Sequence, residues 1–113
     1  MSADKQLPLS PDVLNITTKY INNQRCYLQW GKYSNQRTSL TLIDDKTGEP
    51  VMKVTVNIPE VDVPPGHILV KSWSENAGIF ECLEKHNLLE LITTIPTNHV
   101  YANLCKLLVE LPA

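Results

Sequence analysis

The chain has 113 residues, of which 42% are hydrophobic and 19% charged, with a formal net charge of −2 at pH 7. This length suits one domain around a single core and leaves little room for a second. The apolar content argues against a disordered chain, and the near-neutral charge argues against a strongly basic DNA binder or an acidic DNA mimic. No apolar run is long enough to cross a membrane and no secretory signal is visible, so we expect a cytoplasmic protein.

Residues 1–11 are predicted to form a flexible arm, because Pro8 and Pro11 prevent a helix and the segment has little to bury. We expect residues 12–113 to form one domain. Its strands are recognised by β-branched residues or by a period of two in hydrophobicity, and they are predicted at residues 12–21, 25–33, 38–43, 51–58, 67–73, 88–95 and 99–111.

The segments 38–43 and 51–58 form the clearest hairpin in the sequence. Met52 and Val54 alternate with polar residues in the second strand, as in a half-buried strand. Gly48 is the expected site of a positive φ angle, as in a type I turn followed by a bulge.

One helix is predicted at about residues 75–87. Its start has two alternatives, a capping box formed by Ser72 with Glu75 or an N-cap at Ser74. Asn87 is the expected left-handed C-cap, and Gly78 would lie in the helix interior.

The apolar stripe of this helix predicts how it packs. Ile79, Cys82, Leu83 and His86 are spaced at i, i+3, i+4 and i+7, which places them on one face. A helix this short must bury that face against a sheet. The fold class is therefore α+β, with one mostly antiparallel sheet of about six strands and one packed helix.

The sequence offers little catalytic chemistry, and we expect a non-catalytic protein without a cofactor or a metal. Cys26, Cys82 and Cys105 are far apart in apolar contexts and are predicted to be buried free thiols. Cys82 and His86 have a spacing that chelates metals, but the same face is apolar, which favours a buried histidine. A metal-dependent or cysteine enzyme stays open as a third hypothesis.

A basic and aromatic segment follows the first strand. Residues 1–57 carry seven basic and five acidic side chains, a net charge of +2, whereas residues 58–113 carry three and seven, a net charge of −4. Basic sheet faces with exposed aromatic rings bind single-stranded nucleic acid. The residues of this alternative site are Lys19, Arg25, Tyr27, Trp30, Lys32, Tyr33 and Arg37. The competing interpretation places Trp30 and one or two tyrosines in the core.

The junction between the fifth strand and the helix is the preferred partner-binding site. Trp73, Glu75 and Asn76 are predicted to be exposed there, and Trp73 would be the anchor. Two alternative roles stay open: Trp73 closing one end of the core, and Asn76 satisfying local backbone groups.

The string Val70-Lys-Ser-Trp-Ser-Glu-Asn-Ala-Gly78 resembles the Val-Lys-Asp-Tyr-Ser-Glu-Asn-Glu-Gly string of a family of short, uncharacterised proteins, a domain of unknown function carried by plasmids, phages and other mobile elements. The family's Gly-Glu-Pro turn and Asn-x-Pro strand end correspond to residues 48–50 and 57–59. Trp73 replaces the tyrosine and Ala77 an acidic residue. The resemblance covers about residues 38–90 and implies a mobile-element origin.

These observations together lead to one preferred function. We expect a small protein-binding module, a phage or plasmid accessory or anti-defence protein that contacts a bacterial host protein. Single-stranded nucleic-acid binding is the alternative. An exposed edge strand would also allow a homodimer.

Overall fold

The computed structural model describes residues 5–6, 13–98 and 100–111. In chain order the elements are β1 (Lys5–Gln6), β2 (Val13–Ile16), β3 (Gln24–Lys32), β4 (Thr38–Asp44), β5 (Pro50–Lys53), β6 (His67–Val70), η1 (Ser74–Asn76), α1 (Ile79–Lys85), β7 (Leu89–Pro96) and β8 (Tyr101–Leu107). Of the predicted flexible arm, residues 1–4 and 7–11 lie outside the described residues. Lys5–Gln6 pair with β3 as a short strand.

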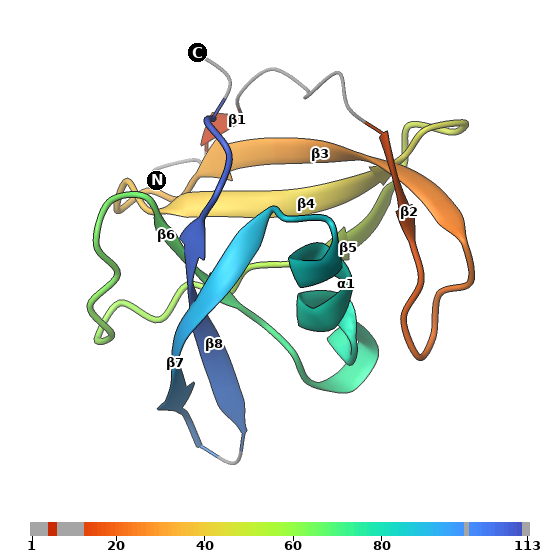
Figure 1. Ribbon diagram of the computed structural model, residues 1–113. Helices are drawn as coiled ribbons and strands as arrows, with labels where there is room; N and C mark the ends of the chain where they lie inside the picture. Colours follow the sequence, from red (N-terminus) through yellow and green to blue (C-terminus); the bar gives the residue numbers. More distant parts are fainter. Residues whose placement is uncertain (1–4, 7–12, 99, 112–113) are drawn as a thin grey trace.

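Within the described residues the strands form two antiparallel sheets, and one short α-helix lies beside them (Figure 1). In the first sheet the order is β1-β3-β4-β5, with β2 also paired to β3, and in the second the order is β6-β8-β7. The predicted α+β class is therefore confirmed. The strands are divided between two sheets rather than joined in the one sheet that we expected.

The division arises just after β5, in the segment Val54–Val56. The N–H of Val54 donates to the carbonyl of Leu40 in β4 at 2.9 Å, while the carbonyl of Val54 accepts from Lys71 at 2.8 Å. Thr55 also forms an isolated antiparallel bridge with Val70. The predicted strand 51–58 thus ends early as a sheet strand, because the chain leaves β4 to reach the second sheet.

The hairpin of β4 and β5 turns as predicted. Gly48 has φ of 73°, and its N–H donates to the carbonyl of Asp44 at 2.9 Å. The register also shifts between Leu42 and Ile43, so a separate irregularity lies in the β4–β5 ladder near the turn.

The predicted helix is divided into η1 and α1. Gly78 is the N-cap of α1 with φ of 91°, and no side chain caps either element. A positive φ at Gly78 cannot continue a right-handed helix, so the chain forms a separate 3₁₀ turn before it. Both predicted helix starts, the Ser72–Glu75 capping box and the Ser74 N-cap, are wrong.

The end of α1 agrees with the prediction at Asn87, which has φ of 59°. The N–H of Asn87 donates to Glu84 at 3.0 Å, and the N–H of Leu88 donates to Leu83 at 3.2 Å. This pair of bonds is a Schellman motif, which satisfies carbonyls that the helix end leaves open.

The main core lies between the two sheets and α1. Its buried side chains are Ile16, Cys26, Leu28, Trp30, Leu40, Leu42, Met52, Val54, Ile68, Val70, Ile79, Phe80, Cys82, Leu83, Leu88, Leu89 and Cys105. Most of the predicted helix stripe is here, but His86 is exposed rather than buried. Its Nε2 lies 3.1 Å from the carbonyl oxygen of Asn15, so the last turn of α1 contacts β2 (Figure 1).

A smaller apolar cluster covers the other side of the second sheet. Leu69, Ala102 and Leu104 are buried there, and partly buried side chains, among them Trp73, pack against them. In the described part of the chain, no helix is long and apolar enough to cross a membrane.

Candidate functional site

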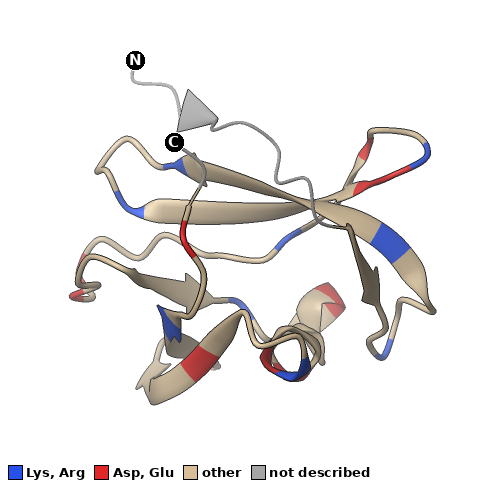
Figure 2. Cartoon of the chain, turned by 45° about the horizontal axis from the view of Figure 1, so that its top comes forward, with Lys and Arg blue, Asp and Glu red and all other residues tan. Residues whose placement is uncertain are grey.

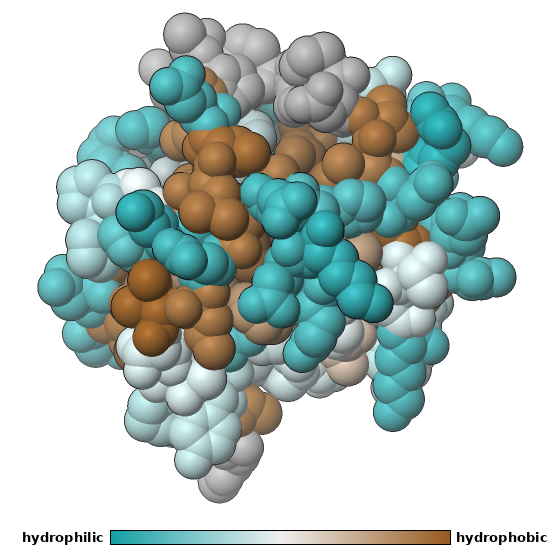
Figure 3. Space-filling model, viewed as in Figure 1, coloured by the Kyte–Doolittle hydropathy of each residue, from teal (hydrophilic) through white to brown (hydrophobic). Residues whose placement is uncertain are grey.

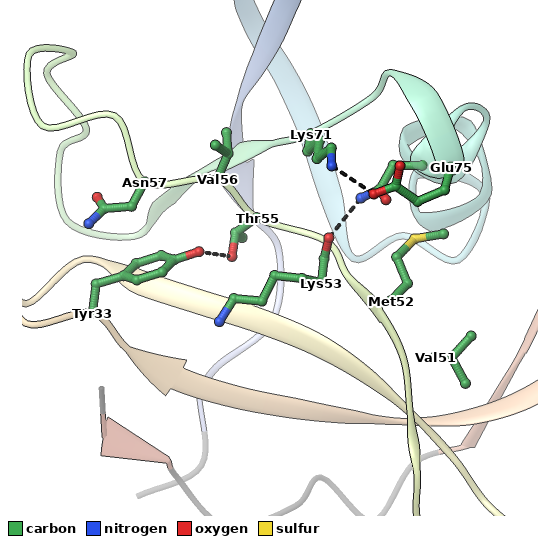
Figure 4. A pocket seen from close by; sticks show the side chains of 10 residues that line it. Tyr33, Val51, Met52, Lys53, Thr55, Val56, Asn57, Lys71 and Glu75 are labelled. Atoms are coloured by element: carbon green, nitrogen blue, oxygen red, sulfur yellow. Dashed lines mark hydrogen bonds and ion pairs between the residues drawn. The ribbon is translucent and has the colours of Figure 1, made fainter. Parts of the chain in front are cut away.

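A pocket of about 460 Å³ opens where β5, the crossing segment Val54–Val56 and the start of η1 meet (Figure 4). We call it the junction pocket. Its lining residues are Tyr33, Val51, Met52, Lys53, Thr55, Val56, Asn57, Lys71, Glu75 and Asn76.

Thr55 fixes one wall of the junction pocket. It is 3% exposed, and its Oγ1 accepts the N–H of Leu40 at 3.1 Å. The same oxygen lies 2.9 Å from the phenolic oxygen of Tyr33, which follows β3 (Figure 4). A buried hydroxyl needs such partners, and these two hold the aromatic ring beside the pocket.

Asn76 forms another part of the wall and corrects a prediction. The sequence places it in an exposed junction, but it is 1% exposed. Its Nδ2 donates to the carbonyl oxygen of Lys53 at 2.7 Å, so the side chain satisfies the last residue of β5. Asn76 therefore has a structural role, as in the alternative, but the backbone group that it satisfies is distant in the chain and not local.

Three charged side chains line the pocket. Lys71 Nζ lies 2.7 Å from Glu75 Oε1, and this hydrogen bond holds the pKa of Glu75 below its ordinary value. The Glu75 side chain is 67% exposed, so solvent weakens the pair. Lys53 Nζ lies 4.9 Å from the centre of the Tyr33 ring, a cation–π distance.

Trp73 lies beside the pocket rather than in it. The centre of its ring lies 5.9 Å from Lys71 Nζ, and the side chain packs on the small apolar cluster that includes Leu69. Of the three residues predicted for the junction, Glu75 and Asn76 line the pocket, and only Glu75 is exposed. Trp73 is partly buried, in line with the alternative in which it closes part of the core.

The predicted basic and aromatic face does not form one surface. Trp30 is 2% exposed and belongs to the core, as its place on the same face of β3 as Cys26 and Leu28 implies. It is therefore not available to stack on a base. Tyr27 lies on the opposite face of β3 and is partly buried.

The basic residues of that face are dispersed, as the Lys and Arg positions coloured on the chain in Figure 2 show. Arg25 pairs with Asp45 at 3.2 Å. Arg37 donates to the carbonyl of Ile58 at 2.7 Å and, together with Lys32, lines a second pocket of about 390 Å³. Lys19 lies 5.4 Å from the Tyr20 ring in the loop after β2.

The three thiols are buried and free, as predicted. Burial raises the pKa of Cys26 to about 11 and that of Cys105 to about 12. Within the described residues, no group of three or more His, Cys, Asp or Glu side chains is placed to hold a metal. Cys82 and His86 both point to the carbonyl of Asn15, at 4.0 and 3.1 Å.

A surface that the sequence interpretation missed lies on the second sheet. Leu91 and Ile92 of β7 are 43% and 50% exposed, and Leu108 and Val109, which follow β8, are 47% and 38% exposed. We call these four residues the apolar strip, and Figure 3 shows apolar surface over this part of the molecule. The sequence feature that could have revealed this surface is the run Leu88-Leu-Glu-Leu-Ile92. This run is more apolar than expected for a strand with one solvent-exposed face.

Comparisons with protein-family models, with curated proteins and with solved structures find no match to this chain.

Proposed function

We propose that the protein is a non-catalytic module that binds another protein by adding an extended segment of the partner to the outer edge of β7. The observation that carries the proposal is the position of β7, which ends the order β6-β8-β7. The backbone groups on its outer edge make no hydrogen bond to another element in the described chain. Unpaired N–H and C=O groups of this kind are a template for an incoming strand.

The composition of β7 supports the same proposal. Proteins usually protect an edge strand with a lysine, a proline, a bulge or a short length, and β7 has one register shift, between Leu91 and Thr93. β7 has eight residues, its only charged residue is Glu90, and its proline is the last residue, Pro96. The edge is therefore long and nearly uncharged.

The apolar strip would supply the side-chain part of the contact. Leu91 and Ile92 are neighbours in β7, at the point where its register against β8 shifts and the regular alternation of side chains between the two faces is interrupted. An incoming strand paired with this edge would lie beside these two exposed apolar side chains. Leu108 is close to the start of β7, because its N–H donates to the carbonyl of Leu88 at 2.9 Å.

The resemblance to mobile-element proteins supports the choice of partner. It suggests a bacterial host protein, bound in the cytoplasm, and an accessory or anti-defence role for a phage or plasmid. The alternative of single-stranded nucleic-acid binding loses its best stacking residue, because Trp30 is buried, and we do not propose it.

The test is affinity capture from a bacterial lysate with three forms of the protein: wild type, Ile92→Lys and Tyr20→Lys. Ile92→Lys places a charge on the β7 edge and should block strand addition. Tyr20→Lys is the matched control, because Tyr20 is 62% exposed but lies in the loop after β2. We expect a protein that wild type and the control capture and that Ile92→Lys does not.

The captured protein is then purified, and its binding to the three forms is measured by calorimetry. A dissociation constant at least about tenfold weaker for Ile92→Lys alone supports the proposal. Equal binding by all three forms contradicts it. A wild-type homodimer in sedimentation velocity that Ile92→Lys dissociates also contradicts it, because a second copy then occupies the edge.

A further inference from the structure

The junction pocket is electropositive in a protein that is negative overall. Its charged lining residues are Lys53, Lys71 and Glu75, a net charge of +1, whereas the whole chain carries −2. The described residues form two ion pairs, and neither of them includes Lys53. The Lys53 ammonium contacts a ring face instead of a carboxylate.

Lys71 already binds a carboxylate at this pocket. Glu75 Oε1 lies 2.7 Å from its ammonium, and the carboxylate comes from a side chain that is 67% exposed. Exposed ion pairs of this kind contribute little stability, so another carboxylate can replace Glu75 at small cost. Glu75 therefore marks a position where an external carboxylate would fit.

Neutral groups of the pocket complete the recognition of an anion. Asn57 also lines the pocket, and its Oδ1 accepts the amide N–H of Asn35 at 3.1 Å, which holds the Asn57 side chain in place. The hydrogen bond between Tyr33 and Thr55 holds the aromatic ring in place. The volume of about 460 Å³ is within the range of small-ligand sites.

We propose that the junction pocket binds a carboxylate group through the ammonium groups of Lys53 and Lys71. The carboxylate belongs either to a small organic acid or to a Glu or Asp side chain of a protein partner. This inference goes beyond the proposed function and does not depend on it, because β7 contributes no residue to the pocket.

The test is a titration followed by ¹H–¹⁵N NMR at constant ionic strength with three probes: sodium glutarate, a blocked peptide with one Glu residue, and inorganic phosphate. We expect saturable shifts at Lys53, Asn57, Lys71 and Glu75 with glutarate or with the peptide. Glutarate alone identifies a small acid as the source, and the peptide alone identifies a side chain. Saturation by phosphate alone, or by none of the probes, overturns the proposal.

Variants with opposite expected effects sharpen the test. Lys53→Met should weaken binding at least about fivefold, because one ammonium is lost. Glu75→Gln should strengthen it, because the carboxylate that competes for Lys71 is removed. Lys85→Met, in α1 and outside the pocket lining, is the control and should leave the affinity unchanged. Weaker or unchanged binding by Glu75→Gln would overturn the proposal.

Discussion

Asn76 Nδ2 donates a 2.7 Å hydrogen bond to the carbonyl oxygen of Lys53, which connects η1 to the end of β5 across 23 residues of sequence. The donor is almost completely buried, at 1% exposure. The hydrogen bond therefore joins η1, which follows β6 of the second sheet, to the first sheet.

Asn76→Ala should lower the free energy of unfolding by about 1–3 kcal/mol, because it removes a buried hydrogen bond and leaves a carbonyl without its donor. Urea denaturation followed by circular dichroism measures the change. The control is Asn35→Ala, which removes an exposed side-chain hydrogen bond to Asn57. It should lower the free energy of unfolding by less than about 0.5 kcal/mol. Equal effects of the two substitutions would show that the buried bond adds nothing.

Gly78→Ala should lower the free energy of unfolding by about 1–3 kcal/mol. Gly78 has φ of 91°, and a Cβ there would lie 3.4 Å from Thr18 Cβ and 3.5 Å from the Lys19 backbone nitrogen. Thermal and urea unfolding measure the loss. Gly48→Ala is the matched control, since its φ of 73° is also positive but a Cβ would meet nothing within 4 Å. Because 3.4 Å is an ordinary van der Waals contact, the two losses should be similar, and an unchanged stability of Gly78→Ala would contradict strain from the positive φ.

The lowered pKa of Asp44 predicts that the free energy of unfolding falls in acid. Hydrogen bonds from the Gln24 side chain and then from the backbone of Lys46 and Thr47 hold the pKa of Asp44 below its ordinary value of 3.8. A carboxyl whose pKa is lowered in the folded state stabilises that state above pH 3.8, and the contribution disappears as the pH falls through the lower folded value.

The measurement is the unfolding free energy of wild type and Asp44→Asn between pH 2 and pH 7. The difference between them should be largest near neutral pH and should shrink at the acid end. Glu49→Gln, in the same turn, is the control for the loss of one charge. A difference that grows toward low pH would contradict the sign of the shift.

The buried thiols should be slow to react in the folded protein. With a pKa of about 11, Cys26 has about a hundredfold less thiolate near neutral pH than a thiol at the ordinary value of 9.0. We expect the Cys82→Ser variant, which retains Cys26 and Cys105, to react with a disulfide reagent at pH 8 only in denaturant. Rapid reaction of this variant without denaturant would show that the core opens easily.

Local patterns in the sequence predicted the strands best. The period of two in β3 and the Gly48 turn are set by neighbouring residues, so the sequence carries them directly. The first strand was predicted too long, at residues 12–21, whereas β2 ends at Ile16. Thr17 and Thr18 end it, because their hydroxyls accept the backbone N–H groups of Asn23 and Ile21 at 3.0 and 3.2 Å.

Features that depend on distant residues were not predictable. The burial of Asn76 requires the end of β5, which is 23 residues earlier in the chain. Gly78, the N-cap of α1, lies against Thr18, which is 60 positions away in sequence. The junction pocket likewise combines residues between Tyr33 and Asn76, so no local motif marks it.

The crossing segment Val54–Val56 has a consequence for the dynamics of the fold. Its backbone forms hydrogen bonds with Leu40 of the first sheet and with Lys71, which follows β6 of the second sheet. The two sheets therefore cannot move apart without breaking these hydrogen bonds. The amide protons of Val54 and Lys71 should therefore exchange with solvent only when the whole domain opens.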